Sequence, residues 1–338
     1  MPMMLGEESY TDPVSDMAAV VVPIGNVDYE FEGVSVDDAY LQSLQNRPDR
    51  AFELFCRALA IEDGSCVWID IGANIGVTSA IMTTTCPAAL VYSVEAGPNL
   101  FSLLCRNIER NGFERVRPLH FALSDNNGEA EFYEASAFGH IVDRRGPGSA
   151  IGETLTVRVP MRTFDDLVSE NLIDVSERQI SLIKVDVEGG ETAVINGMRA
   201  VIERHSPLVW VELNSWTLMS AGLNPIDAVA RMIEGFVEVL RVGGDRDDPR
   251  LFQSITVDDP WATARRLVHD NVVHGRSWED IVLVPPGRKV PEQIRDLELA
   301  APPDELEQLR QQLDLIQRSK VWRYSMPLRR VRSMFRKH

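Results

Sequence analysis

Short apolar runs alternate with longer amphipathic tracts through the central part of the chain. Each run is four to eight residues long and rich in Val, Ile and Leu, which is typical of strands buried on both faces of a parallel sheet. The tracts between them carry apolar residues at spacings of three and four, which predicts helices packed on the sheet. This alternation favours an α/β fold with a doubly wound, mostly parallel sheet. The predicted parallel strands cover residues 67–71, 90–94, 116–123, 182–185 and 208–211.

The same patterns predict the remaining elements. Residues 18–22 form a short N-terminal strand, and residues 236–242 and 281–284 form an antiparallel hairpin at the sheet edge. A stretch rich in Gly, Arg and Ser over 139–152 has no apolar period and is interpreted as a loop. Two further short strands are predicted over 130–133 and 154–159. Helices are predicted over 51–61, 191–204 and 225–233. Three more helices are predicted: one that ends at Thr85, one with Leu100, Leu104 and Ile108 on one face, and one that Thr163 caps.

The first strand leads into a glycine turn that is typical of nucleotide-binding sheets. The order is Asp70-x-Gly72-x-Asn74-x-Gly76, which lacks the third glycine of a dinucleotide site. Glycines let the backbone approach a ligand closely, and the following helix offers free N–H groups. An acid at the strand end suits a ligand that carries an ammonium group, and S-adenosylmethionine is such a ligand.

Two further acids follow strands of the same sheet. Glu95 lies 25 residues after Asp70 and ends the second strand, where an acid can accept hydrogen bonds from both hydroxyls of a ribose. Asp125 follows the third strand, beside the expected position of an adenine. It is interpreted either as an acceptor for the exocyclic amine or as a plain turn acid.

A second acidic cluster follows the fourth strand, with Asp186, Glu188 and Glu191 within six residues. Such crowding is costly unless the acids hold a cation, a donor-rich ligand or a shared proton. The fifth strand ends in Glu212 and Asn214, so the sequence also allows a magnesium-type site with Asp186, Glu212 and Asn214 as oxygen ligands. The alternative is that Glu212 and Asn214 bind sugar hydroxyls directly.

These motifs resemble those of the FkbM family of class I methyltransferases. Residues 70–76 match Asp-x-Gly-Ala-Asn-x-Gly, and residues 186–191 match Asp-x-Glu-Gly-x-Glu, although Gly190 stands where the family often has a bulkier residue. Between them, Ala96 departs from a usual proline, whereas the rest of a second motif is present as Glu95, Pro98, Phe101, Leu104 and Asn107.

The resemblance implies a Rossmann-like class I fold and S-adenosylmethionine as cofactor, with Mg²⁺ as a second candidate. It implies cofactor contacts from Asp70, Gly72, Asn74, Gly76, Glu95, Asp125 and Asp186, and catalytic roles for Asp186, Glu188 and Glu191. The family acts mainly on hydroxyl groups, often of sugars, so a sugar O-methyltransferase of surface-glycan or glycosylated-metabolite biosynthesis is expected. Two alternatives are a catalytically inactive nucleotide-binding scaffold and a nicotinamide-dependent oxidoreductase.

The composition of the chain limits the kinds of partner that the protein is expected to bind. The chain has 338 residues and a net charge of −17, which argues against nucleic-acid binding. Its four cysteines have no Cys-x-x-Cys spacing, so neither a zinc site nor a disulfide framework is indicated. Neither a signal peptide nor a membrane-spanning apolar stretch is recognisable. A cytoplasmic protein is therefore expected.

The C-terminal end differs from the acidic body. Residues 318–338 contain eight Lys or Arg and no acid, interleaved with apolar residues such as Trp322 and Phe335. Such a segment is typical of binding to an anionic membrane surface or a partner protein. The expected organisation is an N-terminal extension over 1–46, a methyltransferase domain over 47–285, a linker over 286–303 and an amphipathic, basic helical tail over 304–338.

Overall fold

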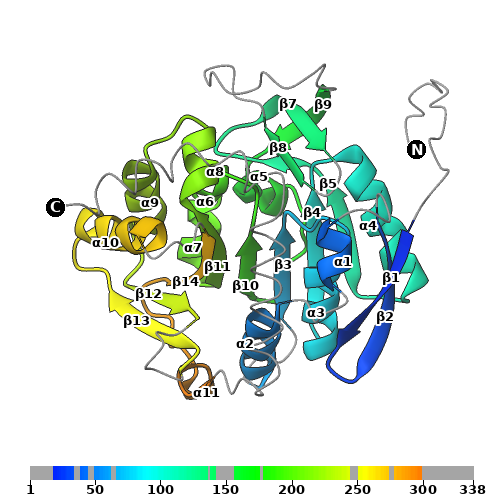
Figure 1. Cartoon of the computed structure of the whole chain (residues 1–338), viewed down its shortest axis with the longest axis horizontal. Coiled ribbons are helices and arrows are strands. Elements are labelled where there is room, and N and C mark those ends of the chain that lie inside the picture. Colours follow the sequence, from blue (N-terminus) through cyan, green and yellow to red (C-terminus); the bar gives the residue numbers. More distant parts are fainter. Residues whose placement is uncertain are drawn as a thin grey trace, which may run out of the picture. The chain divides into compact units, whose positions relative to one another are not determined.

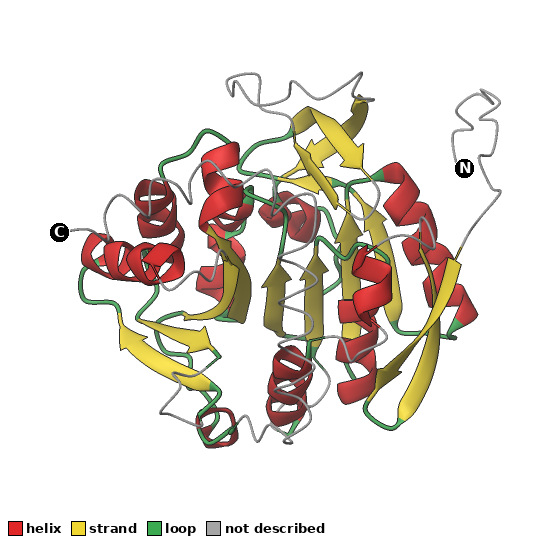
Figure 2. Ribbon diagram, viewed as in Figure 1, coloured by secondary structure: helices red, strands yellow, loops and turns green. Residues whose placement is uncertain are grey.

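A large twisted sheet forms the centre of the protein in the computed structural model (Figures 1 and 2). Its strand order departs from the chain order where β3 lies next to β10 and where β14 lies between β12 and β11, and the first of these is typical of a doubly wound fold. The structure describes residues 18–33, 39–44, 49–61, 66–135, 138–141, 156–175, 178–243, 250–273 and 278–298.

Within these residues the large sheet has eight strands. Five neighbouring strands, from β11 to β5, run parallel, and β14 is antiparallel to both β11 and β12. The predicted parallel sheet with an antiparallel edge is therefore confirmed. In spatial order the strands are β13 (Phe252–Thr256), β12 (Glu238–Val242), β14 (Trp278–Val284), β11 (Leu208–Asn214), β10 (Ile180–Val185), β3 (Val67–Ile71), β4 (Leu90–Glu95) and β5 (Val116–His120).

Helices cover both faces of the sheet, and each face has its own apolar core. On one face, Phe52 and Phe55 pack on Trp210 with ring centroids 5.0 and 5.2 Å apart. The helices of this face are α1 (Ala39–Leu44), α2 (Arg50–Ala60), α3 (Val77–Thr85), α4 (Pro98–Arg110) and α11 (Glu292–Arg295). Those of the other face are α5 (Phe164–Ser169), α6 (Glu191–Asn196), α7 (Arg199–His205), α8 (Ser215–Ser220), α9 (Pro225–Ile233) and α10 (Pro260–Val273).

Two smaller sheets flank the large one. The N-terminal strand β1 (Ala18–Ile24) pairs with β2 (Val27–Gly33), and this hairpin lies beside α4 (Figure 1). A second small sheet contains β6 (Ala122–Leu123), β9 (Thr156–Arg162), β7 (Gly128–Ala135) and β8 (Phe138–Ile141). No helix among the described residues combines the length and apolarity that a membrane span needs.

Three predicted elements differ from the structure. The strand expected over 116–123 is divided, because the chain leaves the large sheet after His120 and β6 pairs with β9 instead. The loop expected over 139–152 begins with residues of β8, and residues 142–152 lie outside the described part.

The helix expected over 191–204 is interrupted at Gly197, where a Cβ would lie only 2.0 Å from Ser124 O. The turn after β6 therefore occupies the space that a straight helix with a side chain at this position would need. The predicted C-terminal tail, residues 304–338, lies outside the described residues.

Candidate active site

Two segments meet at the carboxyl ends of β3 and β10. They are the glycine turn, residues 70–76, and the acidic loop, residues 186–191. Asp186 N donates to Ile71 O at 3.1 Å. Gly72 has φ +78°, and a Cβ there would lie 1.8 Å from Asp186 O. Only glycine lets the two segments approach this closely. Two motifs that are more than a hundred residues apart in the sequence thus form one site.

Glu95 holds the glycine turn from the end of β4. The carboxylate is 6% exposed and accepts from Asn74 N and Gly97 N, each at 2.8 Å. Asn74 has φ +53°, a left-handed conformation that asparagine tolerates better than most residues. The carboxylate lies at the predicted position, next to the backbone of the turn.

Asp70 lies below the turn rather than at its surface. It is fully buried, and its Oδ2 accepts from Thr78 Oγ1 and Ser79 Oγ at 2.6 Å each. Its side chain points to the sheet face that α3 covers, because side chains alternate along a strand. The expected direct contact with a ligand ammonium is therefore not supported, and Asp70 instead fixes the start of α3 on the sheet.

Lys184 is a site residue that sequence reasoning missed. Its ammonium lies 3.1 Å from Asp186 Oδ2 and 3.8 Å from Asp70 Oδ1, and its side chain is 7% exposed. The signal was a single lysine within an otherwise apolar strand, Ile-Ser-Leu-Ile-Lys-Val. Buried charges are normally paired, so this lysine indicated acids from neighbouring strands.

The acidic loop separates Glu188 from Glu191. Glu191 is 2% exposed, and its Oε1 accepts from Val187 N at 3.2 Å and Gly189 N at 3.0 Å. It therefore supports the loop from behind. Glu188 is partly exposed and has φ +55°, a strained conformation of the kind found at functional sites. Burial, and then the charges of Asp186 and Glu191, raise the pKa of Glu188 to about 7.

A candidate cation site contains two of the predicted ligands, Asp186 and Glu212, and has Glu188 in place of the predicted Asn214. Carboxylate oxygens of Asp186, Glu188 and Glu212 lie within 4.8 Å of one another. Glu212 Oε2 is buried and has no hydrogen-bond partner among the described residues, and burial raises the pKa of this carboxyl well above its usual range. A hard cation would complete such an oxygen-lined site.

Asn214 does not join this site. Its Oδ1 accepts from Trp216 N at 3.1 Å and Thr217 N at 3.2 Å, so it caps α8. From the sequence alone, an asparagine that follows a strand can be either a helix cap or a metal ligand. In the structure its side-chain oxygen caps the N-terminus of α8.

Asp280 extends the acidic region onto β14, which the sequence did not indicate. It lies opposite Glu212 in the antiparallel register. Burial, and then the charge of Asp49, raise the pKa of Asp280 well above its usual range. Lys184 is the cation that offsets Asp280 and Asp186, so acids outnumber bases at this end of the sheet.

Asp125 is placed away from these groups by the chain path. It is exposed and follows β6, in the small sheet. Ser124 N donates to Arg162 O at 3.0 Å, which fixes this turn against β9. Both interpretations of Asp125, an acceptor for the exocyclic amine and a plain turn acid, stay predictions.

The sequence match decides the family. Residues 70–234, which include Glu95 and the whole acidic loop, match the methyltransferase FkbM domain. This chain contains a methyltransferase FkbM domain. The predicted relationship is confirmed, and the chain is an enzyme of the methyltransferase class.

Relatives of this chain include a hexuronic acid methyltransferase and a 2-O-methyltransferase. The hexuronic acid methyltransferase AglP of Haloferax volcanii is 27% identical over 189 residues, which are 55% of this chain and 70% of the relative. The 2-O-methyltransferase NoeI of Sinorhizobium fredii is 26% identical over 188 residues, covering 52% and 74% of the two chains.

Solved structures also resemble the chain. Methyltransferase FkbM from Methylobacillus flagellatus KT is 15% identical with a TM-score of 0.36, and the match covers 65% of this chain and 43% of that one. The rRNA N2 G1207 methyltransferase RsmC of T. Thermophilus, in complex with AdoMet and guanosine, is 14% identical with a TM-score of 0.40, covering 82% and 53%. The fold of the FkbM domain is the predicted class I methyltransferase fold.

Proposed function

We propose that this protein transfers a methyl group from S-adenosylmethionine to a sugar hydroxyl. The observation that carries the proposal is the contact of the glycine turn with the acidic loop, at Gly72 and Asp186 O. It puts a nucleotide-type turn and a set of proton-accepting carboxylates at one edge of the sheet. The sugar class is supported by the names of AglP and NoeI.

The residues of the turn fit the cofactor. Glu95 offers a carboxylate at the tip of β4 whose two oxygens already accept backbone N–H groups, and such an oxygen pair suits ribose hydroxyls. The turn itself has no room for a Cβ at Gly72 or Gly76, where the nearest atoms would be 1.8 and 2.8 Å away. When bound, S-adenosylmethionine supplies a methyl group on a sulfonium centre.

Glu188 is the proposed proton acceptor. Its pKa of about 7 matches the range in which a general base works near neutral pH. Glu188 would accept the proton of the acceptor hydroxyl, and bound S-adenosylmethionine would supply the methyl group and leave as S-adenosylhomocysteine. Lys184 keeps the neighbouring Asp186 in place through the 3.1 Å contact, and much of the rate gain is expected from such positioning.

A site for a divalent cation such as Mg²⁺ is the proposed alternative to a free Glu188, because the same carboxylate would then be a ligand. The ligands are Asp186, Glu188 and Glu212, with Glu212 Oε2 as the buried oxygen that needs a partner. A cation held by these carboxylates would supply positive charge that stabilises the developing charge on the acceptor oxygen. In the cation-bound form Asp186 and Glu188 are ligands, so the proton would leave through solvent.

The test is a methylation assay on a panel of sugars. The purified full chain is incubated with S-adenosylmethionine and neutral or uronic-acid oligosaccharides, and mass spectrometry detects the gain of one methylene unit. Glu188→Gln should abolish the product, whereas Glu203→Gln, at an exposed position on α7, should not. A protein that binds the cofactor but methylates none of the sugars contradicts the sugar class.

The basic tail supports a second element of the proposal, a peripheral membrane location at the inner face, near lipid-linked glycan or a glycan-assembly partner. Its support is the sequence of residues 318–338, with eight Lys or Arg, no acid and interleaved aromatic residues. Each base near an anionic surface contributes about 1 kcal/mol. Sedimentation with anionic vesicles should require the tail and weaken with salt; equal sedimentation of full-length and tail-deleted protein contradicts the anchor.

A further inference from the structure

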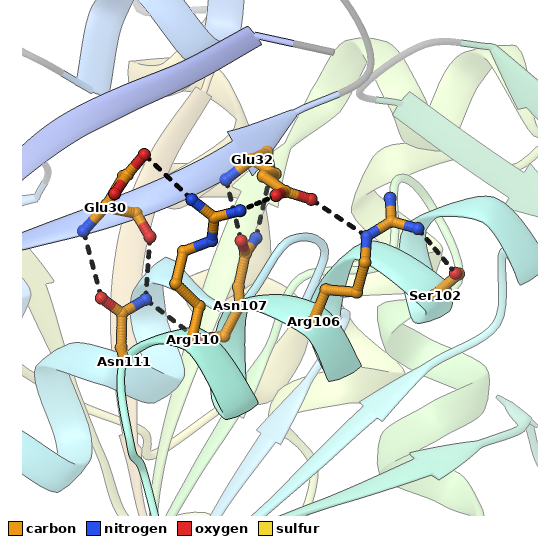
Figure 3. A network of polar contacts seen from close by, with 7 residues as sticks. All are labelled: Glu30, Glu32, Ser102, Arg106, Asn107, Arg110 and Asn111. Atoms are coloured by element: carbon orange, nitrogen blue, oxygen red, sulfur yellow. Dashed lines mark hydrogen bonds and ion pairs between the residues drawn. The ribbon is translucent and has the colours of Figure 1, made fainter. Parts of the chain in front are cut away.

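One buried amide side chain, that of Asn107, joins the glycine turn to a hairpin outside the FkbM domain. Figure 3 shows its contacts with Glu32 of this hairpin. Asn107 lies on α4 and is 1% exposed. Its Nδ2 donates to Ile75 O at 2.9 Å and to Glu32 O at 3.0 Å, and its Oδ1 accepts from Glu32 N at 2.8 Å. A single side chain therefore connects β2, α4 and the loop that follows β3.

The Ile75 carbonyl belongs to a peptide group that is held on both sides. Gly76 N–H, in the same planar peptide, donates to Ala73 O at 2.9 Å. Because Asn107 fixes the carbonyl and Ala73 fixes the N–H, this peptide plane cannot rotate freely. Gly76 thereby keeps the φ of +98° with which it caps the N-terminus of α3.

A second amide repeats the contact with β2 one helical turn later. Asn111 accepts from Glu30 N at 3.1 Å and donates to Glu30 O at 2.8 Å. Four residues along a helix span about 6 Å, and two residues along a strand span about 6.7 Å. The two asparagines therefore match alternate residues of β2 (Figure 3). Of the two, Asn107 is the one that also bonds to the glycine turn, at Ile75 O.

Ion pairs add to the attachment of the hairpin on α4. Arg106 Nε lies 3.0 Å from Glu32 Oε2, and Arg110 contacts Glu32 and also Glu30, the latter at 2.9 Å. The edge of β2 that does not pair with β1 is thus bonded to a helix, which also protects it from pairing with other chains.

We propose that Asn107 is a positioning residue for the cofactor turn and that the β1–β2 hairpin keeps it in place. This rests on the proposed binding of S-adenosylmethionine at the turn. Without Asn107, the Ile75 carbonyl loses its partner inside the protein, and the peptide at Gly76 gains freedom. The turn then has to be ordered when the cofactor binds, which lowers affinity.

The experiment compares Asn107→Ser with Asn111→Ser, because the two asparagines lie on one helix and contact β2 alike. Calorimetry measures binding of S-adenosylhomocysteine, and hydrogen exchange measures residues 73–77 in the protein without cofactor. Asn107→Ser should weaken binding about tenfold and speed up exchange of this segment. Asn111→Ser should lower the melting temperature without either effect.

Equal loss of affinity in both variants, or no loss in either, overturns the positioning role. A wild-type protein that binds no S-adenosylhomocysteine contradicts the proposed function alone, because the exchange comparison needs no cofactor. Should Asn107→Ser not fold, Asn107→Asp replaces it, because its carboxyl keeps an oxygen for Glu32 N–H but loses the amide donor to Ile75 O. Faster exchange of residues 73–77 in that variant supports the proposal, and unchanged exchange overturns it.

Discussion

Replacing Glu191 by glutamine should stabilise the protein at pH 8 far more than at pH 5. Burial raises the pKa of Glu191 to about 7 from an ordinary 4.5. Between these two values the folded protein holds a proton that the unfolded chain has lost, so stability falls as the pH rises through this window. The neutral amide avoids this loss and retains an oxygen that can accept from Val187 N and Gly189 N.

The magnitude follows from the size of the pKa change. The shift from 4.5 to about 7 lowers the free energy of unfolding of wild type by roughly 3 kcal/mol above pH 7 and by less than about 1 kcal/mol at pH 5. Glu191 is 2% exposed, so solvent screening does not reduce the value. Since typical proteins are stable by only about 5–15 kcal/mol, the difference should be visible as a rise in melting temperature of roughly 5 °C at pH 8.

The assay is thermal unfolding of wild type, Glu191→Gln and the exposed-site control Glu203→Gln at both pH values. The control should follow wild type throughout, because Glu203 is an exposed acid on α7. A Glu191→Gln protein whose melting temperature stays parallel to that of wild type from pH 5 to pH 8 would refute a buried, proton-holding Glu191.

Three further predictions concern the acidic site. Asp186→Asn should reduce kcat far more than S-adenosylhomocysteine affinity, because in the proposed function this carboxylate acts on the acceptor hydroxyl. Steady-state kinetics and calorimetry measure the two effects, and parallel losses would contradict this role. Mg²⁺ or Mn²⁺ should raise the melting temperature of wild type at pH 8 but not of Glu212→Gln, and an equal rise in both would exclude Glu212 as a ligand. Lys184→Met should destabilise the protein by roughly 3–5 kcal/mol in denaturant unfolding, because Asp70 and Asp186 lose their cation; a change below about 1 kcal/mol would show that the pairing is unimportant.

Local patterns predicted the parts of the fold that depend on neighbouring residues. The β3 strand, the glycine turn and α3 are contiguous in the chain, so the apolar run and the two glycines were sufficient. The cap of α5 was also local, since Thr163 Oγ1 accepts from Asp166 N at 3.1 Å. Elements of this kind were predicted within a few residues of their ends.

Long-range contacts account for the remaining differences. Phe121 marks no break in the sequence pattern, and the division of β5 from β6 depends on pairing with β9, about forty residues later. Likewise, Gly197 looks like a tolerated helix glycine until Ser124 O is seen to occupy its Cβ position. The contacts of Lys184 with Asp70 and of Asn107 with Ile75 and Glu32 could not be predicted for the same reason, because these partners lie far away in the chain.

Calorimetric titration of S-adenosylhomocysteine into wild type, Glu95→Ala and the exposed-site control Glu109→Ala tests the central claim most directly. The claim is that the turn at residues 70–76 and the end of β4 hold the cofactor. Wild type and Glu109→Ala should bind one molecule per chain with equal affinity. Glu95→Ala should bind at least about tenfold more weakly, since hydrogen bonds to a charged group contribute about 1.5–3 kcal/mol each. Absence of binding by wild type, or equal affinity of all three proteins, would contradict the account.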